Sequence, residues 1–169
     1  MTKDDPRKRV PRRAAYAAML DEVFDSLFPK SLDDIVRKNR EHFQIGLAKA
    51  EEFASRVAKI EPGRSVDTID QWRLVAFRAP PPRLRFEREM SDKVHLSLLG
   101  EAVKARQIWT TSEVMQIDVE GGFARTQNSL YKLGIKGKGE PPREHLICVA
   151  AATHSWGWGT FIAAPEFFY

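Results

Sequence analysis

Three consecutive prolines, Pro80–Pro82, constrain the fold of this chain more than any other feature. Proline has no backbone N–H and a fixed φ, so a run of three is excluded from helix interiors and central strands and acts as a stiff spacer. The spacing of apolar residues is helical before the run and alternating after it. The sequence therefore predicts an α+β protein with a helical region over 14–82 and an antiparallel β domain over 83–169.

The helical region is expected to begin with an amphipathic helix over 14–28, ended by Pro29. Ser31 is placed to cap a second helix that runs to Ile60, and the short link predicts an antiparallel helical hairpin. Residues 65–82 are expected to form a short helix. A strand over 72–77 is the open alternative, because its apolar run fits both periods.

Alternation of apolar and polar residues predicts the strands of the second half. Residues 83–88 and 94–98 form two such runs, and Gly100 is expected to end the second. Further strands are expected over 103–109, 114–119 and, as a strand buried on both faces, 145–153. Gly121 and Gly122 predict a tight hairpin turn. Short strands at this spacing indicate a small antiparallel barrel or strongly curved sheet.

The positive charge is concentrated at the N-terminus. The chain has 27 Lys and Arg against 23 Asp and Glu. Residues 1–13 hold six of these cations and two of the anions, so the remainder is neutral. Because it is almost free of apolar residues, this segment is predicted to be a disordered basic arm, either solubilising or in contact with phosphates. Its candidate phosphate contacts are Arg7, Lys8, Arg9, Arg12 and Arg13.

Residues 134–139 read Gly-Ile-Lys-Gly-Lys-Gly and are the second candidate anion site. Glycines let backbone N–H groups approach an anion, and Lys136, Lys138 and the nearby Arg143 supply charge. The segment lacks the ending of a nucleoside-triphosphate loop. The alternative is a flexible connection between strands.

No catalytic or metal signature is present, and no cofactor is expected. The histidines are far apart in sequence, so a site built from His145, Cys148 and His154 is a minor alternative. Cys148 lies in an apolar stretch that should raise its pKa and leave it inert. A small hydrolase or transferase with a site near His154, Ser155 and Tyr131 is the enzyme alternative.

Aromatic residues gather at the C-terminal end. Such side chains are common anchors of interfaces and stacking platforms. The alternative is that they close the core of the β domain, and docking of the last residues onto a second copy would give a homodimer. The candidate protein-interface residues are Trp156, Trp158, Phe161 and Tyr169.

The passage from Trp109 to Gly134, with Thr110-Thr111-Ser112 and Arg125-Thr126-Gln127-Asn128-Ser129-Leu130-Tyr131, resembles a strand pair of small uncharacterised phage, plasmid and mobile-element proteins. The resemblance implies a context rather than residue roles. Such proteins are frequently stoichiometric binders, including inhibitors of host defence complexes such as anti-CRISPR proteins. Many of those inhibitors are acidic mimics of nucleic acid, and the neutral body with a basic arm departs from that pattern.

These observations predict a cytoplasmic, non-catalytic binding protein, because no apolar run is long enough for a membrane span and the first residues are charged. The first expected partner is nucleic acid or a nucleoprotein complex. The alternative is a mobile-element inhibitor that blocks a host defence protein by protein–protein contact.

Overall fold

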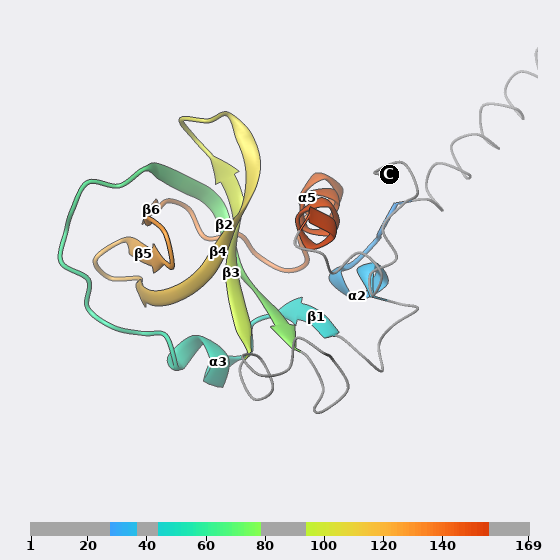
Figure 1. The fold of residues 1–169 in the computed structure, drawn as a ribbon, viewed down its shortest axis with the longest axis horizontal. Coiled ribbons are helices and arrows are strands. Elements are labelled where there is room, and N and C mark those ends of the chain that lie inside the picture. Colours follow the sequence, from blue (N-terminus) through green and yellow to red (C-terminus); the bar gives the residue numbers. More distant parts are fainter. Residues whose placement is uncertain (1–27, 37–43, 79–93, 156–169) are drawn as a thin grey trace, which may run out of the picture.

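The computed structural model describes residues 28–36, 44–78 and 94–155, which form one six-stranded sheet and three helices (Figure 1). The strands are β1 (Gln44–Leu47), β2 (Asp67–Arg78), β3 (His95–Ala102), β4 (Gln107–Asp118), β5 (Phe123–Thr126) and β6 (Leu130–Leu133). The helices are α2 (Leu32–Ile35), α3 (Ala50–Ala54) and α5 (Arg143–Thr153). The expected mixture of helix and mainly antiparallel sheet is confirmed.

Neighbouring strands in the sheet follow the order of the chain and pair antiparallel. One further pairing is parallel and joins the beginning of β2 to β6, with Asp67 opposite Tyr131 and Ile69 opposite Leu133. Strand pairing therefore passes from β2 through β3, β4 and β5 to β6 and returns to β2. The sheet is strongly curved as a result.

Strand β2 bends at an irregularity between Asp70 and Arg73, where its register with β3 shifts. Gln71 lies there with φ of 50°, in the left-handed region. Such a bulge increases local twist and lets one strand change partners. The part of β2 before the bulge pairs with β6, and the part after it pairs with β1.

Gly100 lies in the interior of β3, so the prediction that it ends the strand is wrong. A Cβ atom at Gly100 would lie 2.5 Å from the Asp70 carbonyl oxygen and 2.5 Å from the Ile69 Cγ2 atom. The glycine is required because the bulged backbone of β2 crosses β3 closely at this point.

The two faces of the central strands pack into two separate hydrophobic clusters. Helices α2 and α5 cover one side of these strands, whereas β5 and β6 curl around the other (Figure 1). On the helical side, Phe77 packs with Leu99 and Leu146; inside the curl, Trp72 packs with Leu98. Both faces of β2 are therefore buried over residues 72–77, which agrees with the unbroken apolar run from Leu74 to Phe77.

The long helix predicted over 31–60 is wrong for its described part. Ser31 does cap a helix, since the Asp34 backbone N–H donates to its Oγ at 3.2 Å, but α2 is only four residues long. Strand β1 and helix α3 follow within the same range. The apolar residues of β1 fitted a helical stripe, but pairing with the edge of β2 stabilises the extended form instead. The first helix, over 14–28, lies almost wholly outside the described residues.

The helical assignment of residues 65–82, and with it of the region 14–82, is also wrong where the structure describes it. The strand alternative over 72–77 is correct and forms part of β2. This segment pairs with β1 on one edge and β3 on the other, which local periodicity does not reveal. Strands from both sides of Pro80–Pro82 thus share one sheet.

Residues 145–153, predicted as a buried strand, form most of helix α5. A short apolar run fits either element, and alanines favour a helix once one face can pack. Residues 103–106 form a turn, and the strands expected over 103–109 and 114–119 merge into β4. The hairpin turn at Gly121–Gly122 is confirmed, with Gly122 at φ of 75°.

Candidate functional site

The glycine-rich segment 134–139 is tied to the bulge of β2 through its backbone. The Gly134 N–H donates to the Ile69 carbonyl at 2.9 Å, and the Gly137 N–H donates to the Trp72 carbonyl at 2.9 Å. The Ile135 N–H donates to the Asp70 carboxylate at 2.8 Å. These three N–H groups are therefore engaged within the protein, and they do not form the anion cradle that the sequence suggested. The segment connects β6 to α5 rather than two strands.

Arg73 holds the same segment from inside the molecule. Its guanidinium donates to the carbonyls of Gly139 at 3.0 Å, Lys138 at 2.8 Å and Gln71 at 2.9 Å. The residue is only 8% exposed. No carboxylate in the part of the chain that the structure describes forms an ion pair with it. Arg73 therefore brings into the interior a positive charge that no described carboxylate neutralises by direct contact.

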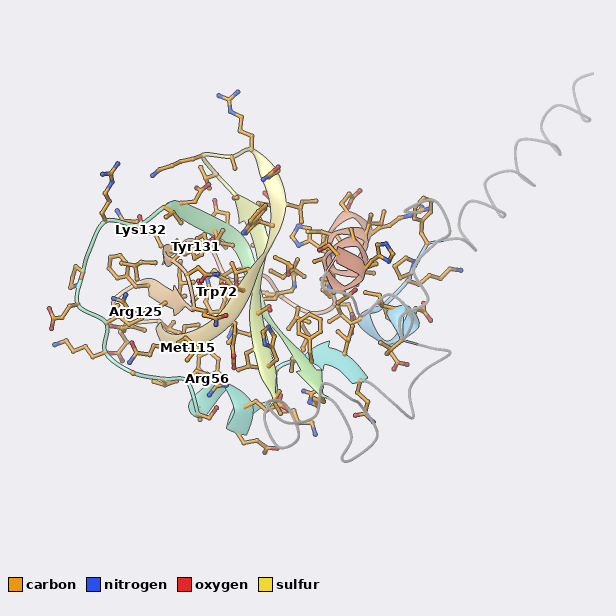
Figure 2. All side chains as sticks on the ribbon, viewed as in Figure 1. Arg56, Trp72, Met115, Arg125, Tyr131 and Lys132 are labelled. Atoms are coloured by element: carbon orange, nitrogen blue, oxygen red, sulfur yellow. The ribbon has the colours of Figure 1, made fainter. Side chains whose placement is uncertain are left out.

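Lys136 places a second cation beside Arg73, over two aromatic rings. Its Nζ atom lies 5.3 Å from the centroid of Trp72 and 5.6 Å from that of Phe53. Within the described ranges it has no carboxylate partner either. The Trp72 indole is fixed because its Nε1–H donates to the Gly134 carbonyl at 3.1 Å. Figure 2 shows Trp72 in the interior of the curved sheet.

These groups line a pocket of about 430 Å³, which we call the aromatic pocket. The pocket lies where β1 and α3 meet the bulge of β2 and the segment 134–139. Apart from the two cations, its described lining residues are apolar, aromatic or glycine, and none of them is acidic. The side chains that carry the argument below are Leu47, Phe53, Trp72, Arg73, Leu74 and Lys136.

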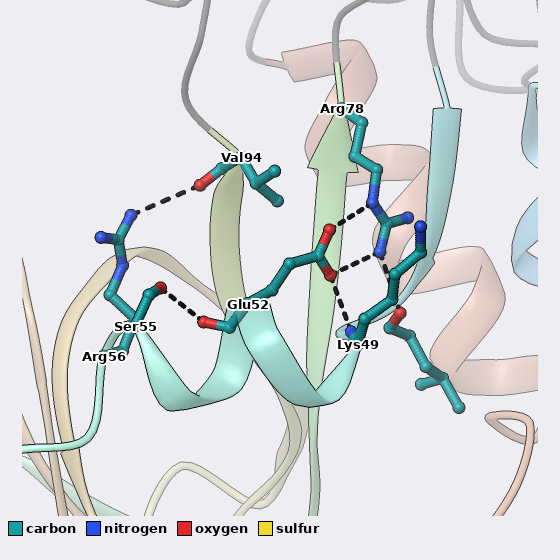
Figure 3. A network of polar contacts seen from close by, with 7 residues as sticks. Lys49, Glu52, Ser55, Arg56, Arg78 and Val94 are labelled. Atoms are coloured by element: carbon teal, nitrogen blue, oxygen red, sulfur yellow. Dashed lines mark hydrogen bonds and ion pairs between the residues drawn. The ribbon is translucent and has the colours of Figure 1, made fainter.

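One wall of the aromatic pocket is held by an ion pair between α3 and β2 (Figure 3). Glu52 accepts from Arg78 Nε and Nη2, both at 2.6 Å, and Arg78 Nη2 also donates to the Leu47 carbonyl at 3.2 Å. Hydrogen bonding from Arg78 lowers the pKa of Glu52. The charge of Arg78 is thus neutralised, in contrast to that of Arg73, and Phe53 is positioned by an anchored helix.

A second pocket, of about 580 Å³, lies near the beginning of α5 and is lined by acidic as well as basic side chains. His145 is 2% exposed, and its Nε2 atom lies 3.8 Å from Glu101 Oε1. Its buried Nδ1 atom has no hydrogen-bond partner within the described ranges. Burial, followed by the charge of Arg73, lowers the pKa of His145. The imidazole is therefore neutral near pH 7.

The structure brings Lys136 and Lys138 together on one segment but uses them differently, because Lys136 lines the aromatic pocket and Lys138 does not. Arg143 begins α5, with its guanidinium carbon 4.5 Å from the centroid of Phe28. The other candidate contacts lie outside the described residues; these are Arg7, Lys8, Arg9, Arg12, Arg13, Trp156, Trp158, Phe161 and Tyr169.

The residues of the enzyme and metal alternatives have different surroundings. Tyr131 is buried in β6, whereas His154 and Ser155 follow α5, and Ser155 Oγ donates to the Ala152 carbonyl at 2.8 Å. Burial raises the pKa of the Cys148 thiol, which confirms the expected direction. In the described part of the chain, no group of three His, Cys, Asp or Glu is arranged to hold a metal ion.

Sequence reasoning missed Phe53, Trp72 and Arg73. The only local signal was a charged residue, Arg73, inside an otherwise apolar run. A buried arginine is normally paired with a carboxylate. The run around Arg73 contains none, which indicated that its guanidinium contacts a distant part of the chain.

Comparison of the chain with protein-family models, with curated proteins and with solved structures gives no match. Among the described residues, no helix has the length and apolar character needed to cross a membrane.

Proposed function

We propose that this chain is a non-catalytic cytoplasmic binding protein that engages nucleic acid, alone or within a nucleoprotein complex. The observation that carries the proposal is the pair of cations Arg73 and Lys136, which share one pocket and have no carboxylate partner among the residues that the structure describes. A charge left unneutralised beside aromatic rings is suited to an anionic ligand with a flat ring system. A nucleotide, which combines a phosphate with a base, meets that description.

Two further features support this proposal. Lys138 lies on the same segment as Lys136 and is exposed, so it is available to a phosphate. The basic arm over 1–13 adds cations that sequence-independent contacts with a phosphate backbone would use. The fold agrees with this role if β2–β6 form a small closed barrel, as we infer from the returning β2–β6 pairing, because several small barrels bind nucleic acids.

The experiment is a salt titration of binding to a fluorescent single-stranded oligonucleotide. We expect the full chain to bind with an affinity that falls steeply as salt rises, because each neutralised phosphate releases counterions. A version starting at Ala14 and a Lys138→Gln variant should each show a shallower slope, by about 0.7 for each lost contact to a single strand. Lys132→Gln is the matched control, since Lys132 is an exposed lysine of β6 that does not line the pocket.

Binding that is insensitive to salt, or slopes that do not differ between the variants and the control, would contradict a phosphate-binding role. The absence of any binding to single-stranded and duplex nucleic acid would do the same.

A second candidate function, blocking of a host protein, is favoured by exposed apolar side chains on β4. Trp109 is 41% exposed and Met115 is 49% exposed. Tryptophan and methionine are enriched in protein interfaces. If this function holds, a protein partner should co-purify after nuclease treatment with the version starting at Ala14 and be lost with a Trp109→Ser, Met115→Ser double variant.

A further inference from the structure

The aromatic pocket combines three features that together define one ligand class. It is concave, with a volume of about 430 Å³, within the range of roughly 300–1,000 Å³ that holds small ligands. Two ring systems, Phe53 and Trp72, form part of its wall. Two cations, Arg73 and Lys136, lie beside the rings. The ligand that fits is a flat ring carrying a negative charge.

Phe53 is half-buried and Trp72 is only 2% exposed, so a ligand meets the Trp72 ring only where it borders the pocket beneath Lys136. Lys136 is exposed, and its ammonium lies over both rings at 5.3 and 5.6 Å. A solvent-accessible cation–π contact contributes only about 0.5–1 kcal/mol, so a base that stacks on the rings can displace the ammonium. The displaced ammonium then becomes available to the phosphate of the same nucleotide.

Arg73 is pre-organised to receive that phosphate. Three of its five N–H groups are held by backbone carbonyls, which fixes the guanidinium plane. Two of its N–H groups remain for an anion in the pocket, and no carboxylate neutralises its charge among the described residues. Any ligand with a free carboxylate or phosphate could interact with Arg73 in this way, but the aromatic walls favour a ligand that also carries a base.

We propose that the aromatic pocket binds one unstacked nucleotide of a single strand, with the base against Phe53 and Trp72 and its phosphate at Arg73 and Lys136. This inference rests on the proposed function and names its ligand class. A base inside a duplex is stacked and cannot enter a concave pocket, so single strands are preferred over duplexes.

The experiment uses the full chain and a single strand of about 12 nucleotides that carries one 2-aminopurine between two abasic sites, because this fluorescent base is quenched by stacking and must be unstacked in the free strand. Phe53→Leu removes a ring and keeps an apolar side chain on α3, so packing is preserved. Phe123→Leu is the matched control, because Phe123 is a half-buried residue of β5 outside the pocket. Lys136→Gln is compared with Lys138→Gln, which removes the same charge two residues away.

We expect the wild-type protein to quench the probe and to bind the single strand more tightly than a duplex of the same sequence. Phe53→Leu should weaken binding roughly 5- to 100-fold and remove the quenching, with an unchanged salt slope. Lys136→Gln should reduce both quenching and salt slope, and Lys138→Gln the slope alone. Urea unfolding of each variant separates loss of binding from loss of folding.

Two outcomes would overturn the inference in distinguishable ways. If salt-dependent binding persists and Phe53→Leu equals Phe123→Leu, the pocket is not the base site, and the proposed function stands. If no strand binds, the proposed function fails, and a titration with free adenosine monophosphate and with inorganic phosphate decides the pocket. If adenosine monophosphate binds and Phe53→Leu weakens that binding, the pocket is a site for free nucleotides. If neither probe binds, the pocket is not an anion or nucleotide site.

Discussion

Replacement of Arg73 by methionine tests whether one buried guanidinium holds the segment 134–139 on the sheet. The change removes three hydrogen bonds to carbonyls, at 2.8 to 3.0 Å, and keeps most of the apolar stem. Hydrogen bonds from charged groups contribute about 1.5–3 kcal/mol each, or roughly 4.5–9 kcal/mol for three. Lys138 and Gly139 are exposed, so water can hydrogen-bond their carbonyls in place of the guanidinium. Removal of an unpaired buried charge also stabilises the variant and offsets part of the loss.

These offsets leave an expected loss of about 3 kcal/mol in the free energy of unfolding. For a chain of this size the loss corresponds to a fall in Tm of roughly 6–12 °C, or of about 1.5 M in the urea midpoint for a slope near 2 kcal/mol per M. Arg125→Met is the control, because Arg125 is exposed on β5, and it should change stability by less than about 0.5 kcal/mol.

The assay is urea unfolding followed by far-UV circular dichroism and, in parallel, by tryptophan fluorescence, so that two-state behaviour is checked. Amide hydrogen exchange at Gly137 gives a local measure, since this N–H donates to the Trp72 carbonyl. If Arg73→Met lowers the midpoint no more than Arg125→Met, or leaves exchange at Gly137 unchanged, Arg73 does not hold the segment.

Two other predictions concern the fold. Gly100→Ala should lower Tm by at least about 3 °C, because its new Cβ would lie 2.5 Å from the Asp70 carbonyl oxygen and overpacking costs about 1–3 kcal/mol; a thermal scan that shows no loss would contradict the close crossing. Burial lowers the pKa of His145 below 6.5, so the unfolded chain takes up a proton first and stability falls as pH drops from about 7 to about 5. In His145→Gln, the urea midpoint should fall less over this pH range. Burial also lowers the pKa of His95, so the double variant His95→Gln, His145→Gln should show a still smaller fall. Midpoints that depend on pH as in the wild-type protein would refute the role of these histidines.

Several features of the fold could be predicted from the sequence because their causes lie within a few residues. The Ser31 cap joins atoms three positions apart, and the Gly121–Gly122 turn depends on local backbone freedom. Strand β3 was visible in strict alternation over 94–98, which belongs to one period only, whereas the expected run over 83–88 lies outside the described residues. Such signals do not depend on what the rest of the chain does.

Elements with ambiguous apolar spacing were decided by their tertiary partners. Residues 44–47 form β1 because they pair with the end of β2, which is about 30 positions away in the sequence. Residues 145–153 form a helix because one face packs against α2 and the sheet. In both cases the local preference is weak, and burial against a distant partner outweighs it.

The candidate site shows the same division between local and tertiary causes. The sequence by itself determined the concentration of cations over 1–13, the glycine-rich segment and the candidates Lys136 and Lys138, because charge and backbone freedom are properties of residue type. Only the tertiary structure decided that Arg73 and Phe53 belong to the same pocket as Lys136. Arg73 lies 65 positions before the Lys138 carbonyl that it contacts, and a contact across that separation depends on the bend of β2, which no local pattern encodes.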